Sequence, residues 1–337
     1  MTSALRTTPF SILDRSRTRE GREPGEALRD TVRLAGLAEE LGYRRFWVSE
    51  HHSVPGVAGS APTVLAAAVA AATSRIRVGT GGVMLPNHRP LVVAEQFGVL
   101  ESLFPGRIDM GLGRSVGFTD GIRRALGAGK DATRDFADQL AELTGYFTGD
   151  QRVHPEVHAQ PAEGLRLPVF VLANAAGARL AAAAGLALVI GDLRSGDRVL
   201  DAIERYRAEF RPSPWLADPY VVIAGTVAVA ETTEAARRLL LPEAFSLARS
   251  RLRGSFPPLV PAEEIEALEP RMTAKEREYF TVALEGQLHG TEDEVAAELE
   301  AVIGRTGADE VLVTTSTYDR EALQDSYRRL ARAAAMS

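Results

Sequence analysis

The sequence predicts an α/β fold, a (β/α)8 TIM barrel with an insertion between the seventh and eighth strands. Eight short apolar runs alternate with segments of helical periodicity along the 337 residues. Such alternation favours a parallel sheet with helices outside it. Eight units fit a closed barrel better than an open sheet. No low-complexity linker divides the chain, so a single domain over residues 1–337 is expected.

Four strands and three helices are expected in the first half of the chain. Leu28, Val32 and Ala35 recur at helical spacing ahead of Gly42, a residue typical of helix ends. In the run RIDMGLG every second residue is apolar, which is typical of a strand. The expected strands cover residues 9–14, 44–50, 74–80 and 107–113, and the helices cover residues 25–42, 60–73 and 91–103.

The second half repeats the pattern around one irregular segment. Residues 250–291 carry three prolines followed by a charged helical stretch. We interpret them as an insertion, either a lid over one end of the barrel or a peripheral helical hairpin. The expected strands cover residues 167–173, 186–191, 220–230 and 308–315, and the helices cover residues 134–147, 174–185 and 197–210, with two more around 296–304 and 321–331.

Composition narrows the classes of function. The net charge is −6, so neither nucleic acid nor an anionic membrane is expected as a partner. The chain has no Cys, which excludes disulfides, thiolate nucleophiles and iron–sulfur clusters. The N-terminal residues lack the apolar core of a signal peptide, and no apolar run is long enough to span a bilayer. A cytoplasmic protein is expected.

Two adjacent histidines follow the second expected strand. Glu50, His51 and His52 lie at its carboxyl end, where the functional groups of a (β/α)8 barrel gather. Neighbouring strand residues face opposite ways, so only one histidine is expected to face the mouth of the barrel. Imidazole suits proton transfer near neutral pH. A structural histidine in a turn or in the core is the alternative.

Further candidates follow the third, fourth and fifth strands. Gly81 and Gly82 would let the backbone approach a flat ligand, or would simply allow a bend. Arg114 ends the fourth strand and would bind a phosphate, or form an ion pair at the rim. Residues 174–177 are small and open a helix, whose N–H groups form either an anion site or an ordinary cap.

Three other patterns are assigned no role in chemistry. His88 and Arg89 are interpreted as surface residues at a helix start. His154 and His158 have the spacing of metal ligands, but the proline between them resists one helix holding both, so no metal is expected. The Arg-rich stretch RSRTREGR after the first strand is interpreted as a solvated loop.

Together these motifs resemble the bacterial luciferase-like, flavin-dependent monooxygenase family. EHH, the segment GTGGVMLPNHRPLVVAEQFGVLESLFPGRIDMGLGR and the small-residue helix start after LPVFVLA occur in the family's order. The similarity runs almost end to end and is densest from Ala38 to Ser115. It looks closest to single-chain actinobacterial-type members of secondary metabolism. The resemblance implies a (β/α)8 barrel, reduced FMN (FMNH2) from a separate flavin reductase, and a homodimer.

The resemblance also implies roles for individual residues. His51 matches the family's acid/base candidate, and Glu50 matches an acidic residue near the flavin ring. Gly81 and Gly82 match a pair that lies against the isoalloxazine and whose peptide bond is cis in relatives. Arg114 matches the phosphate-binding arginine. The family's phosphate cradle is matched by Asn174, Ala175, Ala176 and Gly177.

Three departures from the family pattern matter for the cofactor. Residues 174–177 offer no hydroxyl, so phosphate binding would rest on backbone N–H groups, Asn174 and Arg114. Asp192, after the sixth strand, would place a negative charge near the ring. Gly113 stands where light-emitting relatives carry a reactive Cys. We therefore expect weak binding of FMN, restricted to the reduced form.

The activity implied is that of a two-component monooxygenase. FMNH2 and O2 would react through a C4a-(hydro)peroxyflavin to oxygenate a small apolar or aromatic substrate, with His51 transferring a proton. Two alternatives remain open at this point. One is a deazaflavin (F420)-dependent hydride transferase, which needs no O2, and the other is a flavin-binding protein without catalysis.

Overall fold

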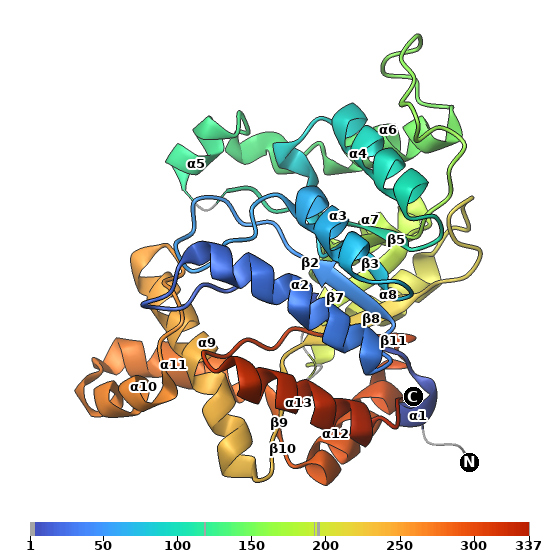
Figure 1. The fold of residues 1–337 in the computed structure, drawn as a ribbon. Coiled ribbons are helices and arrows are strands. Elements are labelled where there is room, and N and C mark those ends of the chain that lie inside the picture. Colours follow the sequence, from blue (N-terminus) through green and yellow to red (C-terminus); the bar gives the residue numbers. More distant parts are fainter. Residues whose placement is uncertain (1–3, 118, 192, 194–195, 337) are drawn as a thin grey trace.

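The computed structural model, which describes residues 4–117, 119–191, 193 and 196–336, contains a closed barrel of eight parallel strands with helices outside it (Figure 1). This confirms the predicted fold class. Strand β1 pairs with β2 on one side and β11 on the other, and the pairing of β3 with β5 closes the ring. The barrel strands are β1 (Phe10–Asp14), β2 (Arg45–Val48), β3 (Arg77–Thr80), β5 (Ile108–Gly113), β6 (Val169–Ala173), β7 (Ala187–Gly191), β8 (Val221–Gly225) and β11 (Glu310–Val313).

Each barrel strand lies inside its predicted range. One predicted strand, residues 220–230, is divided in the structure into two strands, β8 and β9 (Val227–Val229). Strand β9 leaves the barrel and pairs with β10 (Leu288–Gly290). A short β4 (Val83–Met84) extends the sheet beside β5.

Helices surround the barrel in the expected alternation. Helix α7 begins four residues later than predicted, because Asn174 Oδ1 accepts the N–H of Gly177 at 3.1 Å and forms a turn there instead. None of the described helices combines the length and the apolar composition needed to cross a membrane. The helices are α1 (Ala4–Thr7), α2 (Pro24–Glu40), α3 (Pro62–Ala72), α4 (Pro90–Leu103), α5 (Asp120–Ala125), α6 (Phe136–Thr148), α7 (Ala178–Ala184), α8 (Asp197–Glu209), α12 (Glu292–Thr306) and α13 (Arg320–Ala333), with short 3-10 turns η1 (Leu85–Asn87) and η2 (Lys130–Thr133).

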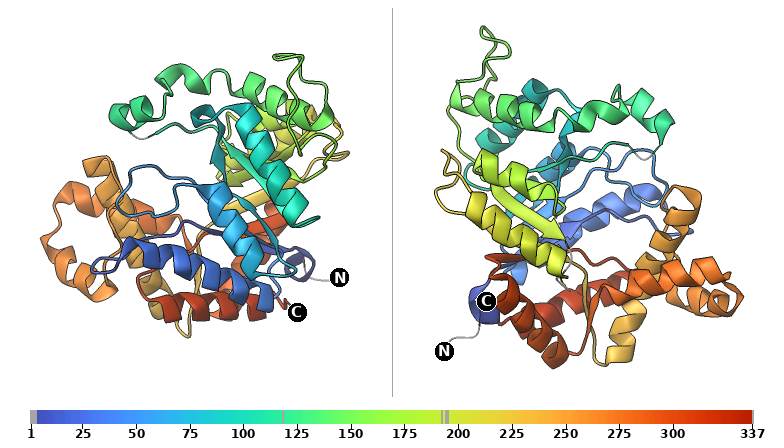
Figure 2. Two further views of the ribbon diagram at one scale, coloured as in Figure 1. Left: turned by 45° about the horizontal axis from the view of Figure 1, so that its top comes forward. Right: turned by 180° about the vertical axis from the view of Figure 1, so that it is seen from behind.

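The insertion between β8 and β11 projects from one side of the barrel (orange in Figures 1 and 2). It contains α9 (Thr233–Arg253), α10 (Ala262–Leu268), η3 (Glu269–Arg271) and α11 (Ala274–Glu285). Leu240, Phe245 and Phe280 belong to a hydrophobic cluster of its own. The predicted insertion, residues 250–291, starts within the last turn of α9. The inserted helical segment therefore begins earlier in the chain than expected.

The barrel interior is filled rather than open. Trp47 is fully buried and packs edge-on against Phe170, with ring centroids 4.8 Å apart. At the amino ends of the strands Arg45 lies 2.8 Å from Asp109 and 3.0 Å from Glu310. The three charges are buried together, and Arg77, 2.7 Å from Asp109, supplies the second positive charge that the two carboxylates need. This end is therefore structural, which leaves the carboxyl ends of the strands for function.

Candidate functional site

His51 lies just after β2, at the carboxyl end of the barrel. Its backbone N–H donates to the Gly59 carbonyl at 2.9 Å, and its Nδ1 lies 3.2 Å from Ser49 Oγ. Burial, together with the positive charges of Arg15 and Arg17, lowers the pKa of His51 to about 4. The imidazole is therefore neutral at pH 7, so it can accept a proton but is not present as an imidazolium acid.

The two arginines near His51 come from the stretch RSRTREGR, which is not a solvated loop. Arg17 and Arg19 are buried, and Arg15 is mostly buried. Glu243 of the inserted helix α9 lies 3.0 Å from both Arg15 Nη1 and Arg17 Nε. The insertion thus contributes a charged residue beside His51. Sequence reasoning missed this because the partner carboxylate lies more than two hundred residues away along the chain.

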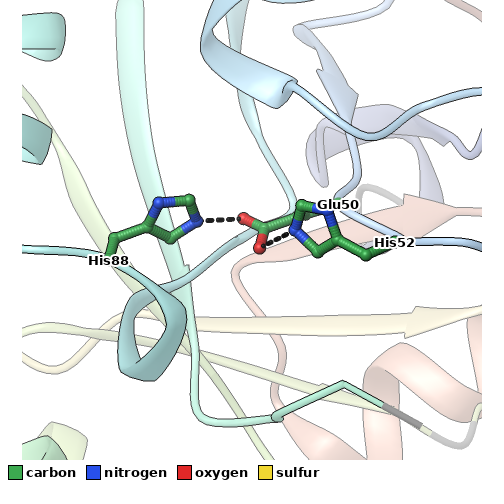
Figure 3. Close-up of side chains that lie close together, drawn as sticks. All are labelled: Glu50, His52 and His88. Atoms are coloured by element: carbon green, nitrogen blue, oxygen red, sulfur yellow. Dashed lines mark hydrogen bonds and ion pairs between the residues drawn. The ribbon is translucent and has the colours of Figure 1, made fainter. Parts of the chain in front are cut away.

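Glu50 is a buried anion with four hydrogen-bond donors around its carboxylate. Its Oε1 accepts from His52 Nε2 at 2.8 Å and Asn87 Nδ2 at 3.2 Å, and its Oε2 accepts from His88 Nε2 and the Met84 N–H, both at 2.9 Å. Burial raises the pKa of Glu50, but the donors outweigh it and the pKa is lowered overall. Figure 3 shows the carboxylate between the two imidazoles. Glu50 therefore fixes the 84–88 segment to the end of β2.

The same three residues are the one group among the described residues whose ligand atoms suit a metal ion. One atom from each of Glu50, His52 and His88 lies within 4.8 Å of the others. Each imidazole, however, contacts a different carboxylate oxygen directly, and both oxygens have a second donor. Zn–N and Zn–O bonds of about 2 Å would require these N–O contacts to open. The arrangement is that of a hydrogen-bonded hub. His88 was expected at the surface but belongs to it, whereas Arg89 is exposed.

Gly81 and Gly82 follow β3, and the peptide bond between them is cis. A Cβ at Gly81 would lie 2.6 Å from Leu13 Cδ1 and 3.2 Å from Trp47 Cε3. A Cβ at Gly82 would lie 2.8 Å from the Gly111 carbonyl oxygen. Neither position has room for a larger residue, so the backbone itself forms this part of the mouth.

A pocket of about 430 Å³ opens between the ends of β5 and β6. Of the predicted cradle, Arg114, Asn174 and Gly177 line it, whereas Ala175 and Ala176 lie in the turn before α7 and do not. Arg114 Nε donates to the Thr133 carbonyl at 3.0 Å. Two residues with hydroxyl groups that sequence reasoning missed, Ser115 and Thr133, also line the pocket.

These groups suit the phosphate of a flavin mononucleotide. Arginine, asparagine, serine and threonine are among the lining residues, and their side chains can donate hydrogen bonds to phosphate oxygens. Ser115, just after β5, and Thr133, in η2, thus carry the hydroxyls that residues 174–177 lack. Ser115 directly follows Arg114 in the sequence, which is the signal that could have identified it.

The structure also places the histidine pair of the 154–158 segment and Gly113, whereas Asp192 is not among the described residues. His154 and His158 are exposed and lie near Glu142 and Glu163. Gly113 is buried, and a Cβ there would lie 2.6 Å from Met84 Sδ. Asp192 lies outside the described residues.

Comparison with known proteins identifies relatives along nearly the whole chain. Residues 8–332 match the family model described as luciferase-like monooxygenase. A "Luciferase-like monooxygenase" of Escherichia coli K12 is 35% identical over 326 residues, covering 96% of each chain. The "N-acetyl-S-alkylcysteine monooxygenase" of Bacillus subtilis is 33% identical, covering 95% of this chain and 96% of its own.

Solved structures share the fold. Apo-MsnO8 superposes with a TM-score of 0.86 at 30% identity, covering 98% of this chain and 99% of its own. Two more distant structures show the fold alone. They are the FMN complex of a type II Baeyer–Villiger monooxygenase (18% identical, TM-score 0.71, covering 97% and 98%) and an F420-dependent secondary alcohol dehydrogenase (16% identical, TM-score 0.69, covering 97% and 99%).

Proposed function

The chain belongs to the luciferase-like monooxygenase family and is a monooxygenase, and from this premise we propose that it is the oxygenase of a two-component system. A separate flavin reductase supplies reduced FMN, and O2 is the second substrate. Reduced FMN, when bound, supplies the electrons that activate O2. The observation that carries the choice of a phosphate-bearing flavin is the pocket beside Arg114, whose polar residues suit a phosphate. A cytoplasmic location follows, since reduced flavin must reach the protein before it oxidises.

Each part of the site has a role in this proposal. Arg114, with Ser115 and Thr133, holds the phosphate, and the Gly81–Gly82 backbone lies against the ring. Glu50 supports that backbone through the hydrogen bonds to the 84–88 segment rather than by touching the cofactor. His51, neutral at pH 7, accepts a proton during the reaction.

Water exclusion is the proposed role of the insertion. Gly56, in the loop that follows His51, donates its N–H to the Phe256 carbonyl at 2.8 Å, and Leu259 donates its N–H to the Thr18 carbonyl at 2.9 Å. Both contacts hold the 250–291 segment against the loops at the mouth. A covered mouth keeps water away from the place where reduced FMN and O2 react, so that a small apolar or aromatic substrate is oxygenated there.

A homodimer is proposed through the outer face of α3 and α4. These adjacent helices expose Val64, Val92, Val99 and Leu103, with Val64 at 70% and Leu103 at 64% exposure. Exposed apolar residues gathered on one face mark interaction sites. Sedimentation velocity should show a dimer that Val64→Glu dissociates.

Anaerobic equilibrium dialysis tests the cofactor assignment. FMNH2 should bind more tightly than oxidised FMN, and more tightly than reduced riboflavin, which lacks the phosphate. Tighter binding of reduced F420 than of FMNH2 would instead support the hydride transferase.

A further inference from the structure

We propose that Arg15 recognises an anionic group of the substrate, a carboxylate, beside His51. The inference rests on the proposed function for the place of the reaction and adds the chemical class of the substrate. Arg15 follows directly after β1, and its side chain is 21% exposed. Its Nε is buried without a hydrogen-bond partner among the described residues. Buried N–H groups are ordinarily paired, so the described residues leave part of the hydrogen-bonding capacity of this guanidinium unused.

Of the two arginines that pair with Glu243, Arg15 has the more exposed side chain, 21% against 3% for Arg17. Arg17 is held by Glu243 and by Ser246 Oγ at 2.5 Å, and it lies 3.5 Å from the Pro257 carbonyl. Glu243 is shared between the two arginines. Arg17 Nε and both Glu243 oxygens are close to their partners but off the hydrogen-bond direction, so the cluster is incompletely satisfied.

The charge balance at His51 favours an anion. Two guanidinium groups face one carboxylate in the cluster, and Glu50, the residue before His51, has its own hydrogen-bond donors. Burial and the two arginines lower the pKa of His51 despite the opposing effects of Glu243 and Glu50. Asp14, the residue before Arg15, is engaged by Thr31 and the Ser16 N–H, and burial raises its pKa. Of the charges that act on His51, the two arginines therefore have a larger effect than the two carboxylates.

The anion is not the cofactor phosphate, because the two sites lie on opposite sides of the ring of strands. The phosphate pocket is built from the ends of β5 and β6. Strand β1 is separated from β6 by three strands on either route around the barrel. A carboxylate at Arg15 would instead hold a substrate next to His51 and offset the positive charge that depresses its pKa.

Isothermal titration calorimetry on the flavin-free protein tests the proposal by comparing the affinity for hexanoate with that for hexanamide, its uncharged isostere. Hexanoate should bind at least about tenfold more tightly than hexanamide. Arg15→Met should remove this preference, Arg15→Lys should keep part of it, and Arg22→Met, in the exposed part of the same loop, should leave it unchanged. Glu243→Gln should tighten hexanoate binding, because the competing carboxylate is gone.

Two results would overturn the proposal. One is equal binding of hexanoate and hexanamide, or no saturable binding of hexanoate by the wild-type protein. The other is an unchanged preference for hexanoate over hexanamide in folded Arg15→Met. If Arg15→Met does not fold, a weaker affinity for hexanoate in Glu243→Gln than in the wild type would overturn the proposal in the same way. No flavin is present in these titrations, so their outcome is independent of whether FMNH2 binds.

Discussion

His88 Nε2 lies 2.9 Å from Glu50 Oε2, and this contact joins the segment after β4 to the end of β2 (Figure 3). Glu50 is 3% exposed and has donors on both oxygens. The chain reaches His88 from β3, the strand that pairs with β2 in the barrel. The contact therefore places the Gly81–Gly82 backbone and the loop of His51 in a fixed relation.

Replacing Glu50 by Gln should destabilise the fold. The amide keeps one acceptor but turns an NH2 toward the donors on the other side, which leaves buried groups unpaired. We expect a loss of about 1–3 kcal/mol in urea denaturation. Glu20→Gln, an exposed site in the loop after β1, serves as the control. If Glu50→Gln lowered the free energy of unfolding no more than Glu20→Gln does, the stabilising role of the hydrogen bonds around Glu50 would be contradicted.

The Glu50 effect should depend on pH. The folded-state pKa of Glu50 is lowered, so the stabilisation is present above the ordinary value of 4.5 and is lost as pH falls through the folded value. The difference in unfolding free energy between wild type and Glu50→Gln should shrink in this acid range. A difference that grows on acidification would show that the carboxylate is not the stabilised form.

Removal of metal should have no effect on the hub. Direct N–O contacts of 2.8 and 2.9 Å occupy the coordination positions of Glu50, His52 and His88. Dialysis against EDTA should leave the melting temperature and FMNH2 binding unchanged. Stoichiometric zinc that survives purification and disappears in His88→Ala would contradict this interpretation.

His51 should titrate with a pKa of about 4 in the folded protein. Between that value and the ordinary 6.5 the unfolded chain binds a proton that the folded chain does not, so stability is lost as pH falls through this window. Histidine side-chain NMR measures the pKa, with His51→Gln to assign the resonance. Arg15→Met should raise it and Arg22→Met should not. A wild-type pKa near 6.5 would contradict the positive environment.

Arg114→Met should weaken binding of reduced FMN but not of reduced riboflavin. The two flavins differ by the phosphate, and a charge-assisted hydrogen bond contributes about 1.5–3 kcal/mol, or roughly tenfold or more in affinity. Thr133→Val should cost less, since it removes one neutral hydroxyl. Equal losses for both flavins would place Arg114 away from the phosphate.

The barrel was predictable because its strands are local, apolar and regularly spaced. All eight ranges, and the position of His51 at a strand end, follow from periodicity and from the rule that function gathers at that face. The Arg114 pocket was partly predictable for the same reason, since Asn174 and Gly177 follow the neighbouring strand.

What was not predictable depends on contacts between distant segments. The stretch RSRTREGR is polar by composition, yet Arg17 is buried because Glu243 and Ser246 come from the insertion to meet it. His88 looks like a helix-start residue until β2 places Glu50 within reach. Thr133 lines the pocket beside Arg114 from η2, a short 3-10 turn with no sequence periodicity of its own.

Rapid mixing of the protein–FMNH2 complex with oxygenated buffer tests the central claim most directly. At saturating protein, re-oxidation of the flavin should be slower than for free FMNH2. It should also pass through a transient species whose absorbance is neither that of reduced nor that of oxidised FMN. Re-oxidation at the rate of free FMNH2, without such a species, would contradict the assignment of this barrel as an FMNH2-dependent oxygenase.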